Sequence, residues 1–194
     1  MFFRKIMKQN MTQEPIVYQT GTYVKLINKA EYCKSIIADG KELIVTGNES
    51  GELIVPELKD PKVYITFKEG ITNFSDVFLG CIKLTSVPAN LFANHPNATS
   101  FSGAFFGCMS LKSIPAGLFD NNRMVTSFSS TFNGCTALTG ESPYTMVNGK
   151  KVHLYERQNY PEHFTEPNLS SYTFTNCINL SDYTQIPNEW KSTI

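Results

Sequence analysis

The chain has 194 residues, with 17 basic and 17 acidic side chains, so its formal net charge is zero. A neutral chain without a basic stripe cannot neutralise a row of phosphates, which argues against nucleic acid as a partner. No apolar run approaches the roughly 20 residues of a transmembrane helix, so we expect no transmembrane segment. The length allows one ordinary domain, or a small cap joined to a short repeat array.

The first 70 residues are predicted to contain a leader and a cap. Residues 1–15 have the character of a loose, polar leader, and no apolar stretch follows its basic residues, so we expect no signal peptide in this chain. Residues 16–70 are expected to form a strand-rich N-terminal cap over the first repeat, since short apolar runs alternate with Gly and Pro turn signals. The expected strands are 23–27, 42–45, 52–55 and 63–67, and residues 30–38 fit one short helix.

Three copies of one pattern follow the cap, and a degenerate fourth copy occupies residues 169–187. Phe, Cys and Leu recur in the first three copies at a spacing of 27 residues, which predicts stacked coils that bury one face against each other. No repeated position carries a base, a nucleophile or a set of metal ligands, so we expect no catalytic residue, metal or cofactor. The predicted structural ladder comprises Phe74, Phe78, Cys81, Leu84, Phe101, Phe105, Cys108, Leu111, Phe128, Phe132, Cys135, Leu138, Phe174, Cys177 and Leu180.

Short strands and short turns are expected within each coil. The segments 84–87 and 111–114 are predicted strands, each ended by a proline, which has no N–H to donate to a ladder. The segments 88–92 and 115–119 begin with that proline and are predicted to form one short helical or 3-10 turn each.

The repeat motif resembles the BspA-like leucine-rich repeat family of bacterial surface proteins. Residues 108–115 match the opening of that family's motif, C-x-x-L-x-x-I with a following proline, and residues 104–108 match its closing A-F-x-x-C. The family's common repeat is shorter, so this chain resembles a variant with a 27-residue repeat. Together with the local pattern, the resemblance implies an α/β repeat: a short leucine-rich-repeat solenoid of about four coils over residues 71–194, with a C-terminal cap.

The same resemblance implies where the protein acts and on what. Family members are associated with adhesion, so the expected location is the cell surface or the extracellular space. The expected partner is a host or neighbouring-cell surface protein or glycan. A fold alone does not define a function, so the partner follows only by analogy.

Four of the five cysteines occupy one position of the repeat. Stacked strands lie ~4.8 Å apart with their side chains parallel, whereas a disulfide needs Cβ atoms about 3.5–4.5 Å apart. We therefore predict a column of buried free thiols, although Cα atoms at such a spacing would also allow a bridge. No C-x-x-C pair or histidine cluster accompanies them, which argues against a metal site.

An insertion at residues 140–168 interrupts the repeats. Its Asn148-Gly149 pair predicts a two-residue hairpin turn between strands 143–147 and 150–157, because both residues tolerate positive φ angles. Two interpretations stay open: an aromatic-rich recognition surface, or a hairpin whose Tyr and Leu side chains pack back onto the coils. The candidate binding residues are Tyr144, His153, Tyr155, Arg157, Tyr160 and His163.

Two functions compete. The first is a non-enzymatic cell-surface protein-binding or adhesion module, which predicts exposed aromatic side chains on the insertion or on the strand face. The alternative is a structural spacer or capping segment of a larger surface assembly with no ligand of its own, which predicts that the insertion's aromatic side chains are buried. An enzyme would need a cleft with convergent titratable groups, and the sequence suggests none.

Overall fold

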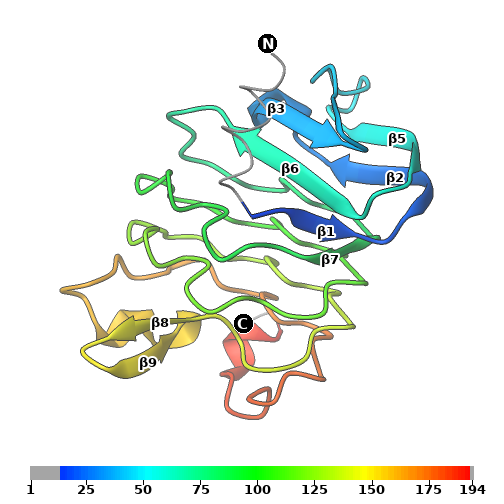
Figure 1. Ribbon diagram of the computed structural model, residues 1–194. Coiled ribbons are helices and arrows are strands. Elements are labelled where there is room, and N and C mark those ends of the chain that lie inside the picture. The colour runs from blue at the N-terminus through cyan, green and yellow to red at the C-terminus, as the bar shows by residue number, and fades with distance from the viewer. Residues whose placement is uncertain (1–13, 193–194) are drawn as a thin grey trace.

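The computed structural model describes residues 14–192, and its regular structure is mainly β (Figure 1). The predicted leader thus lies almost wholly outside the described residues. Three short 3-10 helices are present in the described part: η1 (Ala30–Tyr32), η2 (Leu154–Asn159) and η3 (Asn188–Trp190). The strands there are β1 (Ile16–Tyr18), β2 (Gly21–Ile27), β3 (Cys33–Ala38), β4 (Lys41–Glu42), β5 (Leu53–Leu58), β6 (Lys62–Phe67), β7 (Leu84–Ser86), β8 (Tyr144–Val147) and β9 (Lys150–His153).

The N-terminal part of the chain forms two antiparallel sheets. The larger sheet has the order β4-β3-β6-β1-β7, and β2 pairs with β5 in the smaller one. The alternation of apolar and polar residues explains why residues 62–67 form β6, since Val63, Ile65 and Phe67 are buried and the residues between them are not. β1 lies between β6 and β7 and is antiparallel to both, so it joins the cap to the first repeat.

The short helix expected over residues 30–38 is wrong. Only Ala30–Tyr32 form a single 3-10 turn, and Cys33–Ala38 form β3. β3 pairs with β6 through contacts such as Ile36 with Ile65, and its two adjacent isoleucines are β-branched residues that favour a strand. Residues 33–38 therefore form a strand because β6 is available to pair with them.

The expected α/β leucine-rich-repeat solenoid is also wrong. The regular structure of the described residues is mostly antiparallel sheet, and the repeats contain no helix and do not close into a solenoid. Leu84–Ser86 is the strand of the first repeat, and it pairs with β1 of the cap, whereas residues 111–114 form no strand at all. The expected helical segments are single turns, in which the amide N–H groups of Leu91 and Leu118 donate to the carbonyls of Pro88 and Pro115 at 3.2 and 3.3 Å.

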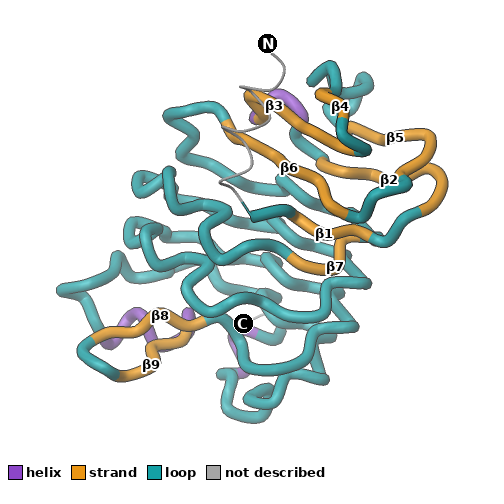
Figure 2. The backbone as a smooth tube through the Cα atoms, viewed as in Figure 1, coloured by secondary structure: helices purple, strands orange, loops and turns teal. Residues whose placement is uncertain are grey.

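The repeats nevertheless lie one upon another, as a stack of loops below β7 (Figure 2). Isolated parallel bridges join Asn73 to Ser100 and Ser100 to Ser127, and a further bridge joins Ser127 to Leu169. The rings of Phe78, Phe105, Phe132 and Phe174 stack in one column, with centroids 5.4, 5.4 and 5.7 Å apart and planes within 10° of parallel. Every residue of the predicted ladder is buried.

The four cysteines of the repeats form a second column inside this stack, whereas Cys33 lies in β3 of the cap. All five are free and buried, as the sequence predicts. The Sγ atoms of Cys108, Cys135 and Cys177 each donate to a phenylalanine carbonyl of the preceding repeat, at 3.1, 3.0 and 3.0 Å. A thiol is small and only weakly polar, so it both fills the space and satisfies a buried carbonyl.

The turns before the cysteines pack closely against the preceding repeat, as Gly103 shows. Gly103 has φ +62°, and a Cβ atom there would lie 2.2 Å from Oδ1 of Asp76 in the preceding repeat. Both the backbone conformation and the contact require a residue without a side chain.

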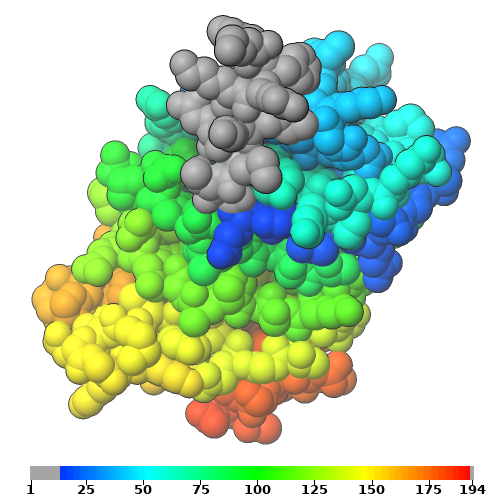
Figure 3. Space-filling view, viewed as in Figure 1, coloured from blue at the N-terminus to red at the C-terminus, as the bar shows by residue number. Residues whose placement is uncertain are grey.

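The insertion and the C-terminus complete the molecule. β8 and β9 form the predicted hairpin, with φ angles of 48° at Asn148 and 79° at Gly149. The second strand, predicted over residues 150–157, ends at His153 instead, and residues 154–157 belong to η2. The hairpin lies beside the lower repeats, and the repeats form a continuous band between it and the cap (Figure 3). Trp190 of η3 packs against Phe128 and Phe174 with ring centroids 6.3 Å from each, and covers the apolar end of the stack.

Candidate functional site

The six candidate binding residues of the insertion do not form one exposed surface. Tyr155 and Arg157 are buried, with 8% and 0% of their surface exposed. Each of the remaining four is half-buried: Tyr144, His153, Tyr160 and His163. This placement favours the interpretation in which the hairpin packs back onto the repeats.

Arg157 anchors the insertion to the second repeat. Its Nη1 and Nη2 atoms donate to the carbonyls of Asn122 and Phe119 at 3.0 and 2.9 Å. The guanidinium also lies 4.4 Å from the ring centroid of Phe164. Desolvation by burial lowers the pKa of Arg157 to about 9, although the Asp120 carboxylate opposes the shift. A buried guanidinium bound to backbone carbonyls is a structural clamp, and its Nε, which has no hydrogen-bond partner among the described residues, is buried as well.

A buried polar cluster joins the hairpin to the last repeat. Asp182 accepts hydrogen bonds from the amide N–H and the hydroxyl of Ser142, at 2.9 and 2.5 Å. His153 also approaches Asp182, with its Nε2 3.5 Å from the same Oδ2 that the Ser142 hydroxyl contacts. Burial and, secondly, the Asp182 carboxylate raise the pKa of Tyr155 to about 12.

This cluster contains Ser, His and Asp, but it is not arranged as a nucleophile with its base. The hydroxyl of Ser142 donates to the carboxylate and not to the imidazole, whereas a serine nucleophile needs a base within hydrogen-bond reach. Ser142 is also buried, so a substrate has no access to it. The cluster holds the fold together and carries no acyl-transfer chemistry.

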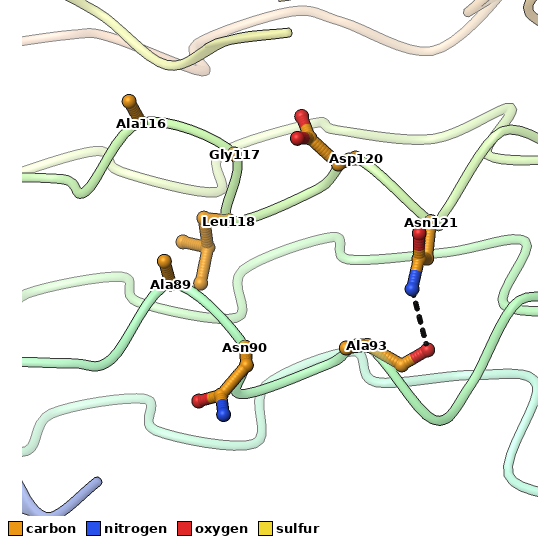
Figure 4. Close-up of a pocket in the computed structure, with 8 residues that line it drawn as sticks. All are labelled: Ala89, Asn90, Ala93, Ala116, Gly117, Leu118, Asp120 and Asn121. Carbon is orange, nitrogen blue, oxygen red and sulfur yellow. Dashed lines mark hydrogen bonds between the residues drawn. The ribbon is translucent and has the colours of Figure 1, made fainter.

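One open pocket of about 270 Å³ lies between the outer turns of the first and second repeats (Figure 4). Its polar groups serve these turns: the Nδ2 of Asn121 donates to the carbonyl of Ala93 at 3.0 Å, as the dashed line in Figure 4 shows. One carboxylate, that of Asp120, reaches the pocket, and its lining contains neither a base nor a nucleophile to act with it. The lining residues are Ala89, Asn90, Ala93, Ala116, Gly117, Leu118, Asp120 and Asn121.

Four exposed apolar side chains lie along one edge of the stack. The residue directly after the cysteine is Ile82, Met109 and Ile178 in three of the four copies, with 53%, 58% and 68% of its surface exposed. Phe106, two residues before Cys108, is 40% exposed. We call Ile82, Phe106, Met109 and Ile178 the apolar edge.

Backbone hydrogen bonds bring these residues together. The amide N–H of Gly80 donates to the carbonyl of Phe106 at 2.8 Å, and those of Gly107 and Gly134 continue the pattern to the third and fourth copies. The apolar edge therefore follows the stacked turns that contain the cysteines. Thr136 interrupts it in the third repeat.

The cap extends the apolar edge at its upper end. Nζ of Lys83 donates to the carbonyl of Thr22 at 2.9 Å, which places the start of β2 beside the turn that carries Ile82. The next residue of β2, Tyr23, is 80% exposed and has φ +50°, an unusual conformation for an aromatic residue. The sequence interpretation missed this surface because it sought aromatic residues in the insertion, although the repeat alignment already showed an apolar residue after three of the cysteines.

Two further properties bear on function. Within residues 14–192, no group of three or more His, Cys, Asp or Glu side chains is placed to hold a metal ion. In the same part of the chain, none of the helices has the length and apolar character needed to cross a membrane.

Comparisons with protein-family models, with curated proteins and with solved structures found no match. The resemblance to the BspA-like family thus rests on the motifs of the repeat alone.

Proposed function

We propose that the chain is a non-enzymatic protein-binding module that acts in adhesion at the cell surface, and that the apolar edge makes the contact. The apolar edge is the observation that supports this proposal. Burial in the fold requires an apolar residue at the cysteine position but not at the exposed position after it. Exposed apolar side chains that lie near each other on a folded domain are typical of interaction surfaces.

The chemistry of the apolar edge suits a protein partner better than a glycan. Isoleucine and methionine offer dispersion contacts and no hydrogen bonds, and methionine adapts to partners of different shape. A stable protein interface covers about 800 Å² on each partner, so the contact would extend from the apolar edge onto neighbouring residues such as Tyr23. The surface location and the host or neighbouring-cell partner follow from the family resemblance.

A second candidate function has its own support. The insertion hides Tyr155 and Arg157, as the sequence analysis predicts for a structural spacer or capping segment of a larger surface assembly. In that case the hairpin serves to thicken and stabilise the lower repeats, and the apolar edge contacts a neighbouring part of the same assembly.

A binding screen tests the proposal. The purified chain is applied to immobilised extracellular-matrix proteins and to a glycan array, together with the double variant Ile82→Ser/Met109→Ser. The matched control is Met124→Ser/Met146→Ser, which changes two methionines that are equally exposed but lie elsewhere, at 50% and 54%.

We expect saturable binding to a protein that the first variant loses and the control retains, with circular dichroism spectra unchanged. Binding retained by both variants would remove the apolar edge from the proposal. Absence of saturable binding across both panels would contradict adhesion and favour the spacer. Binding to glycans alone would contradict the choice of a protein partner.

A further inference from the structure

The upper end of the apolar edge contains a lysine that the fold holds in place. Lys83 follows Ile82 directly in the sequence and is half-buried. Its Nζ donates to the carbonyl of Thr22 at 2.9 Å, and its backbone carbonyl accepts from the amide N–H of Gln19 at 2.7 Å. Both contacts are with the cap, so the ammonium group is fixed where the cap meets the first repeat.

The backbone of the cap leaves room for this ammonium group. Gly21, at the start of β2, has φ +134°, and a Cβ atom there would lie 3.0 Å from Nζ of Lys83. Any side chain at this position would crowd the lysine, and the backbone conformation also favours glycine. The close approach indicates that the position of the charge is built into the fold.

No carboxylate within residues 14–192 forms an ion pair with this ammonium group. Lys25 of β2 pairs with Glu52 at 2.6 Å, and Glu57 of β5 pairs with Lys59 at 3.2 Å. Asp76, the acidic residue of the first repeat, lies against the turn of the second repeat instead. The positive charge at the upper end of the apolar edge therefore remains available to a partner.

A strained aromatic residue lies beside the lysine. Tyr23 follows Thr22 in β2, is 80% exposed and has φ +50°. A left-handed backbone is unfavourable for a bulky residue, and the exposed ring gains little burial in return. Backbone strain that packing does not explain is concentrated at binding sites. The conformation therefore indicates a role for the ring in contact with a partner.

We propose that Tyr23 and Lys83 select the partner of the apolar edge, and that this partner is a protein segment with an Asp or Glu side chain next to an apolar one. The inference rests on the proposed function, in which the apolar edge binds a protein. Lys83 pairs with the carboxylate, while Tyr23 and Ile82 contact the apolar side chain. Complementary charge of this kind discriminates between partners more than it raises affinity. A lysine already fixed by the fold also loses little side-chain entropy when it pairs.

Two matched peptides test this proposal by NMR titration of the nitrogen-labelled chain. One is an acidic tripeptide with Asp between Phe and Leu, and the other has Asn in place of Asp. Both are acetylated and amidated, so the carboxylate is the only difference in charge between them. We expect amide shifts at Tyr23, Ile82 and Lys83, with a Kd about three- to fivefold lower for the acidic peptide. This preference should disappear at about 1 M salt, where charges are screened within about 3 Å.

Three variants assign the preference to the lysine. Lys83→Gln keeps a donor for the Thr22 carbonyl but not the charge, so it should bind both peptides equally. Lys83→Arg keeps the charge and should keep the preference. The matched control is Lys150→Gln, which changes an exposed lysine of the hairpin that forms no ion pair within residues 14–192 and should leave the preference unchanged.

Tyr23→Gly tests the aromatic contact. Removing the ring should raise the Kd of both peptides about two- to tenfold, the range of one aromatic contact. Because glycine relieves the positive φ, the urea midpoint should not fall. Unchanged Kd values or a lower midpoint would overturn the assignment of Tyr23 to the contact.

The peptide results separate this inference from the function on which it rests. Equal Kd values for the two peptides in the wild type, or a preference that Lys83→Gln retains, would overturn the choice of an acidic partner and leave the apolar edge as a protein-binding surface. Absence of shifts at the apolar edge with both peptides would contradict this inference and the proposed contact together.

Discussion

Two neighbouring phenylalanines test how the repeats are held together. Phe105 is fully buried and stacks between Phe78 and Phe132 with ring centroids 5.4 Å away on each side. Phe106 lies on the apolar edge and is 40% exposed. The same substitution by alanine at the two positions therefore separates packing within the stack from contact with a partner.

The expected effects differ several-fold. Removing a buried phenylalanine costs about 3–5 kcal/mol, and each lost stacked pair adds about 0.5–1.5 kcal/mol beyond area burial. Phe105→Ala should therefore cost at least about 4 kcal/mol, a large part of a typical stability of about 5–15 kcal/mol. Phe106→Ala should change the free energy of unfolding by no more than about 0.5 kcal/mol, as exposed substitutions do.

Urea denaturation measures both effects through the fluorescence of Trp190, the single tryptophan, which is buried at the end of the stack. A circular dichroism transition that coincides with the fluorescence would show that the stack and the cap unfold together. Phe105→Ala should lower the midpoint at an unchanged slope. Equal costs for the two substitutions would refute the assignment of Phe105 to the core and of Phe106 to the surface.

Three further predictions concern the stability of the fold. Gly103→Ala should lower the free energy of unfolding by more than the ~1–2 kcal/mol of a left-handed backbone alone, because the new Cβ atom clashes with the Asp76 carboxylate. The control is Gly40→Ala, at φ +70° with no atom within 4 Å, whose urea midpoint measures the backbone contribution alone. Arg157→Leu leaves the carbonyl of Asn122 unpaired and removes one of the two hydrogen bonds to that of Phe119, so it should cost about 2–5 kcal/mol in the same assay, against about 0.5 or less for the exposed Arg123→Leu. Burial raises the pKa of Cys81 to about 12. Because an unfolded thiol loses its proton at a pKa of about 8.5, the stabilisation is complete below that pH and is lost up to about pH 12. In a pH series of urea midpoints, Cys81→Ala should show an alkaline loss smaller by as much as about 1.4 kcal/mol per pH unit.

Features with local causes were predictable from the sequence. The 27-residue period identified the side chains that stack, since equal spacing puts equivalent residues above each other. The Asn148-Gly149 turn needs only its own two positive φ angles. The predicted α/β class was wrong because a segment of three to five residues takes its conformation from the strand that it pairs with. Leu84–Ser86 pairs with β1 and forms a strand, whereas residues 111–114, with a similar pattern, have no strand to pair with.

The insertion could not be placed from the sequence for the same reason. Arg157 binds carbonyls 35 and 38 residues away, and a backbone carbonyl has no sequence signature. The aromatic residues around it are equally compatible with an exposed surface and with a packed one until these contacts are known. The apolar edge was accessible in principle, because the position after the cysteine is apolar in three copies while the period assigns it to neither column of the core.

The break at Thr136 distinguishes the two functions. It divides the apolar edge into an upper part beside the cap, with Ile82, Phe106 and Met109, and the separate Ile178 in the last repeat. A partner that needs continuous apolar contact would use the upper part, since hot-spot residues cluster near the centre of an interface. Met109→Ser should therefore weaken binding by about tenfold or more, while Ile178→Ser changes it by less than about threefold in the same surface-binding assay. The opposite ranking would place the contact at the lower end of the stack, as expected for a segment that joins a larger assembly end to end.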